Sequence, residues 1–206
     1  SPHFRVLEIV EDTIGNIWFG TSEGLIKYDG VKFKTFSFEE GLPGVNAEIW
    51  GLTIDKNGLI WVGAIGGVCQ FNGEQFTPFS LPTAKVENAT PMLSDKLVFK
   101  IIEDNKGNMW FVTDGNGIFK YENGVFIHLT AKKELTDNNA ADIFEDKQGN
   151  IWIGTFNGGV SKFDGKTYTN FTKAGIIAGV ETYNFYEDSQ GNIWFTAEGY
   201  GVYRYD

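Results

Sequence analysis

One pattern, Asp-x-x-Gly-Asn-x-Trp, occurs five times along this 206-residue chain with small variations. Its tryptophans are 43, 49, 42 and 42 residues apart, at Trp18, Trp61, Trp110, Trp152 and Trp194. Self-similarity at a period of about 40–50 residues is the signature of a repeat architecture, in which each copy is one structural unit. The repeat therefore constrains the fold more strongly than any single residue does.

Each copy contains segments typical of short strands. The first segment precedes the Asp, the second carries the Trp, and the third ends at a Tyr or Phe. A fourth carries a pair of aromatic or apolar residues, such as Phe33 and Phe36, and is missing from the fifth copy. The segments are rich in β-branched and aromatic residues and bounded by Gly, Asn or Asp, which indicates strands. In the first loop the Asp can bind turn amides and the Gly can adopt a positive φ.

Four-stranded units of this length cannot bury both faces alone, so they must stack on one another, and radial stacking gives a β-propeller. We predict an all-β protein, a β-propeller of five four-stranded blades, with the last blade reduced to three strands where its fourth segment is missing. The repeats form a single domain over residues 1–206, with boundaries at about 1–43, 44–92, 93–137, 138–179 and 180–206. Five blades form either a closed ring or part of a larger one.

Charge and composition exclude several classes of partner. The net charge is −10 and the arginines are Arg5 and Arg204 alone, so no basic stripe is available for nucleic acid. No apolar run approaches the length of a membrane helix, so we expect no direct membrane insertion. The single cysteine, Cys69, lies in a third segment where packing explains it. We expect no cofactor and no metal.

The pattern EDxxGNIWFGT…GGVxKFDGxxYxxFT resembles the two-component regulator propeller repeat over nearly the whole chain. That repeat is found in the extracytoplasmic sensor regions of bacterial hybrid histidine kinases, notably those that respond to glycans. The resemblance implies a periplasmic or extracellular domain that senses a ligand, with a histidine-kinase signalling module in a parent chain. Such sensors carry more repeats, a further β-domain and a membrane helix, so this chain is expected to be an excised piece or a free-standing relative.

Binding residues are expected on what we call the loop face. It is formed by the loops between second and third strands and by the connections from one blade to the next, which vary most among copies, and loops on a rigid scaffold are where binding residues concentrate. Aromatic rings stack on sugars while amides and carboxylates bind hydroxyl groups. The predicted ligand-binding residues are Trp50, Phe156, Tyr183 and Tyr200 for stacking, and Asn116, Asn157 and Glu198 for hydrogen bonds.

Trp50 is the strongest of these candidates because it is the one tryptophan outside the repeat series. In other copies its position holds Leu7, Phe99, Ala141 and Tyr183. The alternative is that Trp50 only closes the mouth of a central channel. The predicted function is non-catalytic binding of an oligosaccharide or similar polar ligand.

The sequence also suggests other functions. A protein-interaction scaffold without a small-molecule site is the main alternative. A propeller lyase is a further one, but the two histidines, His3 and His128, belong to different parts of the repeat and form no acid–base pair. Asp104, Asn105 and Asn108 could be read as calcium ligands, but the loop lacks the alternating acids and the terminal Glu of a calcium loop. The repeated Trp residues are expected to pack between blades rather than bind sugar.

The end of the chain carries a separate expectation. A last blade of three strands leaves residues 202–205 as an exposed edge, and exposed edges invite pairing. We therefore predict weak self-association through this final edge strand, or more repeat sequence downstream in a parent protein.

Overall fold

The structure, a computed structural model, describes residues 4–44, 48–83, 86, 91–172, 174–177 and 181–206. His3 lies outside the described residues. Nineteen strands are described, arranged in five antiparallel sheets, and within each sheet every strand pairs with the next along the chain. None of the described helices is long and apolar enough to cross a bilayer.

Each sheet is one blade of the repeat. Blade 1 contains β1 (Val6–Glu11), β2 (Ile17–Thr21), β3 (Gly24–Tyr28) and β4 (Phe33–Phe36), followed by the 3-10 turn η1 (Phe38–Glu40). Blade 2 contains β5 (Ile49–Ile54), β6 (Ile60–Ala64), β7 (Gly67–Phe71) and β8 (Phe76–Phe79). Blade 3 contains β9 (Val98–Glu103), β10 (Met109–Thr113), β11 (Ile118–Glu122) and β12 (Val125–Leu129).

Blade 4 contains β13 (Ala140–Glu145), β14 (Ile151–Thr155), β15 (Gly159–Phe163) and β16 (Tyr168–Asn170). Blade 5 contains β17 (Thr182–Glu187), β18 (Ile193–Ala197) and β19 (Gly201–Tyr205), which form a sheet of three strands. The prediction of an all-β propeller with a three-stranded last blade is confirmed.

The repeated Asp closes the turn between the first two strands and also fixes the Trp. In blade 3, Oδ1 of Asp104 accepts hydrogen bonds from the backbone N–H groups of Lys106 and Asn108, at 3.0 and 2.8 Å. Its Oδ2 accepts from Asn108 Nδ2 at 2.8 Å and from Trp110 Nε1 at 2.9 Å. The indole bond recurs in all five blades. Gly107 takes the positive φ of 85° that the turn needs.

The tryptophans pack between blades, as predicted. Trp110 and Trp152 are among the largest fully buried side chains, 0% and 1% exposed. Trp18 of blade 1 meets Phe71 of blade 2 at 5.8 Å between ring centroids, and Trp61 meets Phe111 of blade 3 at 5.7 Å. The Trp-bearing face of each of blades 1 to 4 thus packs on the opposite face of the following blade.

Close packing between blades also needs small residues in the second strands. A methyl group added to Gly63 in β6 would lie 2.9 Å from the carbonyl oxygen of Val98 in β9, which is too close for a carbon atom. Glycine at this position lets the inner strand of the next blade approach the sheet.

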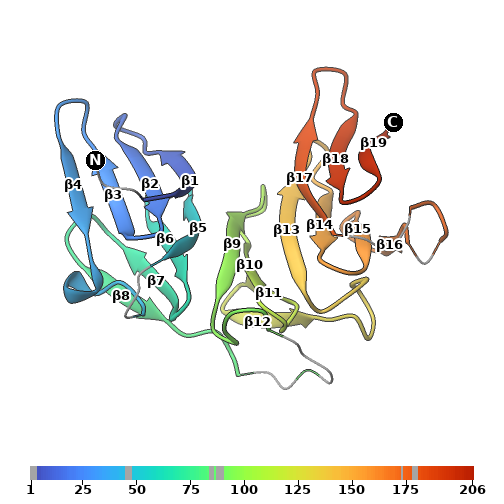
Figure 1. The fold of residues 1–206 in the computed structure, drawn as a ribbon, viewed down its shortest axis with the longest axis horizontal. Coiled ribbons are helices and arrows are strands. Elements are labelled where there is room, and N and C mark those ends of the chain that lie inside the picture. The colour runs from blue at the N-terminus through green and yellow to red at the C-terminus, as the bar shows by residue number, and fades with distance from the viewer. Residues whose placement is uncertain (1–3, 45–47, 84–85, 87–90, 173, 178–180) are drawn as a thin grey trace.

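The blades lie along an open arc (Figure 1). The inner strands β1, β5, β9, β13 and β17 line its concave side, and each packs against the next in that order. No comparable packing within the described residues joins β17 back to β1, and the two lie on opposite sides of the opening in Figure 1. The first and last blades therefore each have one face that no other blade covers.

Candidate functional site

The inner strands are irregular at their loop-face ends. In β5 the pairing with β6 shifts between Ile49 and Gly51, so Trp50 is left outside the regular register. Similar shifts occur in β1, β9, β13 and β17. A β-bulge changes the direction of a side chain and often lies beside a functional site. The bulges thus set the direction of the inner-strand side chains at the loop face.

Three aromatic rings from different blades meet there, and we call them the aromatic row: Trp50, Phe99 and Phe156. The centroids of Trp50 and Phe99 are 5.6 Å apart in an edge-to-face arrangement, and those of Phe99 and Phe156 are also 5.6 Å apart. Trp50 and Phe156 are half-buried against the core that blades 3 and 4 share. The Nε1 atom of Trp50 is buried and has no hydrogen-bond partner within the described part of the chain.

The structure thus brings together two of the predicted stacking residues through a third, Phe99, that was not predicted to bind. The signal for Phe99 was present in the sequence, because it occupies the repeat position of Trp50 in the third copy.

A cavity of about 360 Å³ opens between blades 2 and 3 on the same face. It is bordered by the loop after β6, the loop after β10 and the long connection that leads from β8 to β9. Its lining combines the rings of Phe79 and Phe119 with polar groups of Asn116 and Lys96. Asn116 also holds the connection in place, because its Nδ2 donates to the carbonyl oxygen of Asp95 at 3.1 Å.

The remaining predicted residues lie apart from the aromatic row. Tyr183 is half-buried in β17, where its carbonyl oxygen accepts a hydrogen bond from Thr196 Oγ1 at 2.8 Å. Asn157 is exposed in the loop after β14, and Glu198 and Tyr200 are exposed in the loop after β18. No contact between these side chains and the row is described.

Glu198 has a carboxylate neighbour of its own. The backbone N–H of Glu198 donates to the carbonyl oxygen of Glu181 at 2.9 Å, and the two carboxyl groups are neighbours. Burial and this neighbouring carboxyl group raise the pKa of Glu181. Glu181 and Glu198 thus form an acidic pair on the loop face of blade 5.

A charged cluster occupies the concave side of the arc. Lys100 Nζ lies 3.3 Å from a carboxylate oxygen of Glu8 and 3.3 Å from one of Asp142, so it connects blades 1, 3 and 4. Burial alone would lower the pKa of Lys100, but the carboxylates of Asp142 and Glu8 outweigh it and the pKa is raised. These residues share one repeat position, four before the Asp, and were not singled out from the sequence.

The histidine and the cysteine of the described chain are both packed against other groups. His128 stacks on Phe119 with 4.4 Å between centroids, and its Nε2 lies 2.6 Å from the carbonyl oxygen of Asn116. Burial raises the pKa of the Cys69 thiol to about 12, so it stays protonated and unreactive. In the described ranges no three His, Cys, Asp or Glu side chains are grouped as a metal site would require.

Two segments, residues 92–115 and 134–157, match the family model of the two-component regulator propeller. They cover the loop, second strand and Trp of blades 3 and 4. The resemblance found in the sequence is therefore confirmed.

Solved structures with the same fold include sensor domains and an enzyme. The extracellular domain of a hybrid two-component system of B. thetaiotaomicron is 22% identical with a TM-score of 0.78, over 98% of this chain and 28% of that one. The extracellular domain of a one-component system of the same organism is 19% identical with a TM-score of 0.76, over 99% and 30%. Virginiamycin B lyase from Staphylococcus aureus is 16% identical with a TM-score of 0.68, over 99% and 73%.

At these identities the likeness establishes the propeller fold. This chain spans less than a third of the length of the two sensor domains that it matches. No curated protein is similar enough in sequence to serve as a relative.

Proposed function

We propose that this two-component regulator propeller is a non-catalytic, extracytoplasmic ligand-sensing domain whose loop face binds a neutral or weakly charged glycan or a similar polar ligand. The observation that carries the proposal is the cavity of about 360 Å³ between blades 2 and 3, on the face where the repeat is irregular. Sites for small ligands occupy roughly 300–1,000 Å³ and combine apolar walls with a few polar groups. Phe79, Phe119 and Asn116 supply that combination.

The aromatic row supports the same proposal from a second place on the loop face. Sugar rings stack on aromatic faces. A sugar ring would stack on the part of the row that solvent reaches, while Tyr183, Tyr200, Asn157 and Glu198 would extend the contact surface toward blade 5.

The family and the sensor-domain neighbours support extracellular placement and a signalling partner. A binding domain of this kind would pass its signal to a kinase module in a parent chain. The arrangement of His128 favours binding over lyase chemistry, because its ring is stacked and its Nε2 faces a backbone carbonyl.

A thermal-shift screen of neutral oligosaccharides tests the proposal. A binding sugar should raise the melting temperature of the wild type, and the shift should shrink in Asn116→Ala and in the double variant Trp50→Ala with Tyr200→Ala. Gln190→Ala, an exposed change in a turn at the other end of the strands, is the matched control and should keep the full shift. If no neutral sugar shifts the wild type and a defined protein partner binds instead, the scaffold function replaces this one.

A further inference from the structure

Three of the connections between blades insert one apolar side chain into the core that the two joined blades share. Each inserted residue lies six positions after the residue that closes the aromatic or apolar pair of the preceding fourth strand. We call the three side chains the plugs: Leu42, Leu135 and Ile177. They are 1%, 0% and 7% exposed, and each belongs to a core cluster with residues of both neighbouring blades.

A plug fills the space beside the glycine at or next to the start of the third strand. A Cβ atom built on Gly24 would lie 3.8 Å from Leu42 Cδ1, and one built on Gly117 would lie 3.6 Å from Leu135 Cδ1. The corresponding glycine of blade 2 is Gly67. Its chain neighbours aside, no atom of the described residues lies within 4 Å of the same point there. The space that a plug fills in blades 1 and 3 is therefore open in blade 2.

The sequence of the connection from β8 to β9 accounts for the opening. Six positions after Phe79, where the other copies have a plug, this connection has Lys85, which lies outside the described residues. Residues 84–85 and 87–90 include no Leu, Ile, Val, Met or aromatic side chain. This part of the connection therefore offers no residue of the plug type.

The large apolar residues further along the connection point into solvent instead. The side chain of Asp114, which is 0% exposed, accepts hydrogen bonds from the backbone N–H groups of Met92 and Leu93, each at 2.7 Å. It also accepts from the N–H of Ser94 at 3.0 Å. Met92 and Leu93 are 55% and 57% exposed. The buried carboxylate thus fixes the connection in a course on which neither side chain serves as a plug.

The cavity of about 360 Å³ lies at this opening, because Gly67 and Val68 both border it. Val68, Phe79 and Phe119 give it apolar walls. A hydroxyl group placed against such walls would lose its hydrogen bonds to water without gaining a partner, which is costly. The opening therefore favours an apolar group of the ligand, in the place that a leucine or isoleucine side chain takes between other blades.

Two hydrogen-bonding groups of opposite kind border the same cavity. The Nδ2 atom of Asn116 is bound to the carbonyl oxygen of Asp95, and its Oδ1 has no donor within the described residues, so it can accept. Lys96 is exposed, forms no ion pair in the part of the chain that the structure describes, and can donate. Because Asp95 also borders the cavity, the charges of Asp95 and Lys96 cancel, which favours a neutral ligand group.

Resting on the proposed function, we infer that the glycan carries an acetamido group and that this group occupies the opening in blade 2. Its methyl takes the place of a plug against Gly67 and Val68. Its N–H donates to Asn116 Oδ1, and its carbonyl oxygen accepts from Lys96 Nζ. A sugar hydroxyl lacks the methyl, and the methyl of a deoxy sugar lacks the amide donor and acceptor, so neither matches all three features.

Titration calorimetry and saturation-transfer NMR with matched sugars test the inference on the whole chain. The probes are the methyl glycosides of N-acetylglucosamine, N-acetylgalactosamine and N-acetylmannosamine, each paired with the hexose that has a hydroxyl in place of the acetamido group. At least one N-acetylated sugar should bind about tenfold or more tightly than its hexose, the discrimination that one apolar group gives in a fitted pocket. Its acetyl methyl should receive the strongest saturation, because it lies against the protein.

Variants place the acetamido group. Val68→Phe fills the opening and should abolish the preference for the N-acetylated sugar. Lys96→Ala removes the donor from an exposed position, so it keeps the fold and should weaken the preference even where Val68→Phe fails to fold. Lys132→Ala, an exposed lysine in the connection that carries the plug Leu135, is the matched control and should bind like the wild type.

The failure of this inference and that of the proposed function are distinguishable. Equal affinity for the N-acetylated sugars and their hexoses, or binding of only those neutral oligosaccharides that lack acetamido groups, would overturn the inference and leave glycan binding standing. A preference that is unchanged in Lys96→Ala and in folded Val68→Phe would also overturn it, because the acetamido group would then bind elsewhere. If no sugar binds at all, the proposed function fails and this inference fails with it.

Discussion

The inner blades and the two ends of the arc use the same residue types at the same repeat positions, but their burial differs. The residue that follows the glycine at the start of each third strand is apolar in all five blades. It is 0–4% exposed in four of them and 64% exposed in the last: Leu25, Val68, Ile118 and Val160, against Val202.

The other end shows the same contrast on the opposite face. Ile9 in β1 is 59% exposed, whereas its equivalents Leu52, Ile101 and Ile143 are 1–4% exposed. Local sequence and strand register are alike at these positions, so the difference in exposure comes from the presence or absence of a neighbouring blade. In a repeat protein stability is approximately a sum of intrinsic and nearest-neighbour terms, and the end blades lack one neighbour each.

The largest expected effect is the loss of a tryptophan between two blades. Trp152 is 1% exposed and stacks on Phe171 at 5.7 Å, so Trp152→Ala should lower the free energy of unfolding by about 3–5 kcal/mol. Trp194→Ala should cost about half of that or less, because Trp194 is only half-buried and its removal takes less apolar area out of the core. Urea unfolding followed by circular dichroism measures both. Equal losses would contradict the nearest-neighbour interpretation.

A smaller effect is expected from the turn carboxylate. Asp104→Ala leaves Trp110 Nε1 and Asn108 without their acceptor in a buried site, where each hydrogen bond to a charged group contributes about 1.5–3 kcal/mol. Asp188→Ala in blade 5 should cost less, because its turn is more open to water, which can replace the lost acceptor. The same urea titrations apply, and a larger cost at Asp188 would refute the comparison.

The pH dependence should follow from the same carboxylates. Burial raises the pKa of Asp104, but hydrogen bonds from Asn108 and Trp110 outweigh it and the net shift is downward. A carboxyl group with a lowered folded-state pKa contributes its stability fully above its unfolded value of about 3.9 and loses it as the pH falls further. The stability gap between the wild type and Asp104→Asn should therefore narrow between about pH 5 and pH 3. A gap that stays constant over this range would argue against the shift.

The sequence predicted the fold well because the repeat states each structural requirement five times. The loop Asp and Gly, the apolar first strand and the Trp position recur with little change, so strands, turns and blade count could be read directly. The hydrogen bond between the repeat Trp and the repeat Asp was not predicted. The bond from Trp110 Nε1 to Asp104 depends on how the second strand leaves the turn, which no single residue type encodes.

The candidate site was less predictable because it depends on contacts between copies. Trp50 was identified by its residue type, but its contact with Phe99 depends on bulges in two different inner strands. The cluster around Lys100 is formed by equivalent positions of three blades that lie far apart in the sequence. Comparing the residues at one repeat position in all five copies would have indicated both the Trp50–Phe99 contact and the Lys100 cluster.

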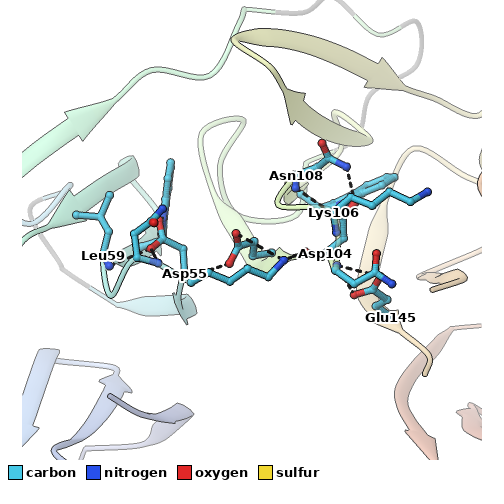
Figure 2. A network of polar contacts seen from close by, with 12 residues as sticks. Asp55, Leu59, Asp104, Lys106, Asn108 and Glu145 are labelled. Carbon is cyan, nitrogen blue, oxygen red and sulfur yellow. Dashed lines mark hydrogen bonds and ion pairs between the residues drawn. The ribbon is translucent and has the colours of Figure 1, made fainter. Parts of the chain in front are cut away.

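The smallest effect is expected at a contact between neighbouring blades, in which the Glu before the repeat Asp accepts a hydrogen bond from a backbone N–H in the turn of the preceding blade. Figure 2 shows this contact between the turn of blade 3 and Glu145 of blade 4. Glu187 makes it, and Glu11 at the same position of blade 1 does not make it within the described residues. The Glu187 side chain is 6% exposed, accepts from the backbone N–H of Lys147 at 2.7 Å and lies 3.7 Å from its Nζ. Glu187→Ala should lower the free energy of unfolding by about 0.5–1.5 kcal/mol, the net value of a typical hydrogen bond. Glu11→Ala should leave the free energy of unfolding unchanged, because no group in the described chain donates to that carboxylate. A loss in Glu11→Ala as large as that in Glu187→Ala would contradict the comparison, because it would show that Glu11 makes the same contact in solution.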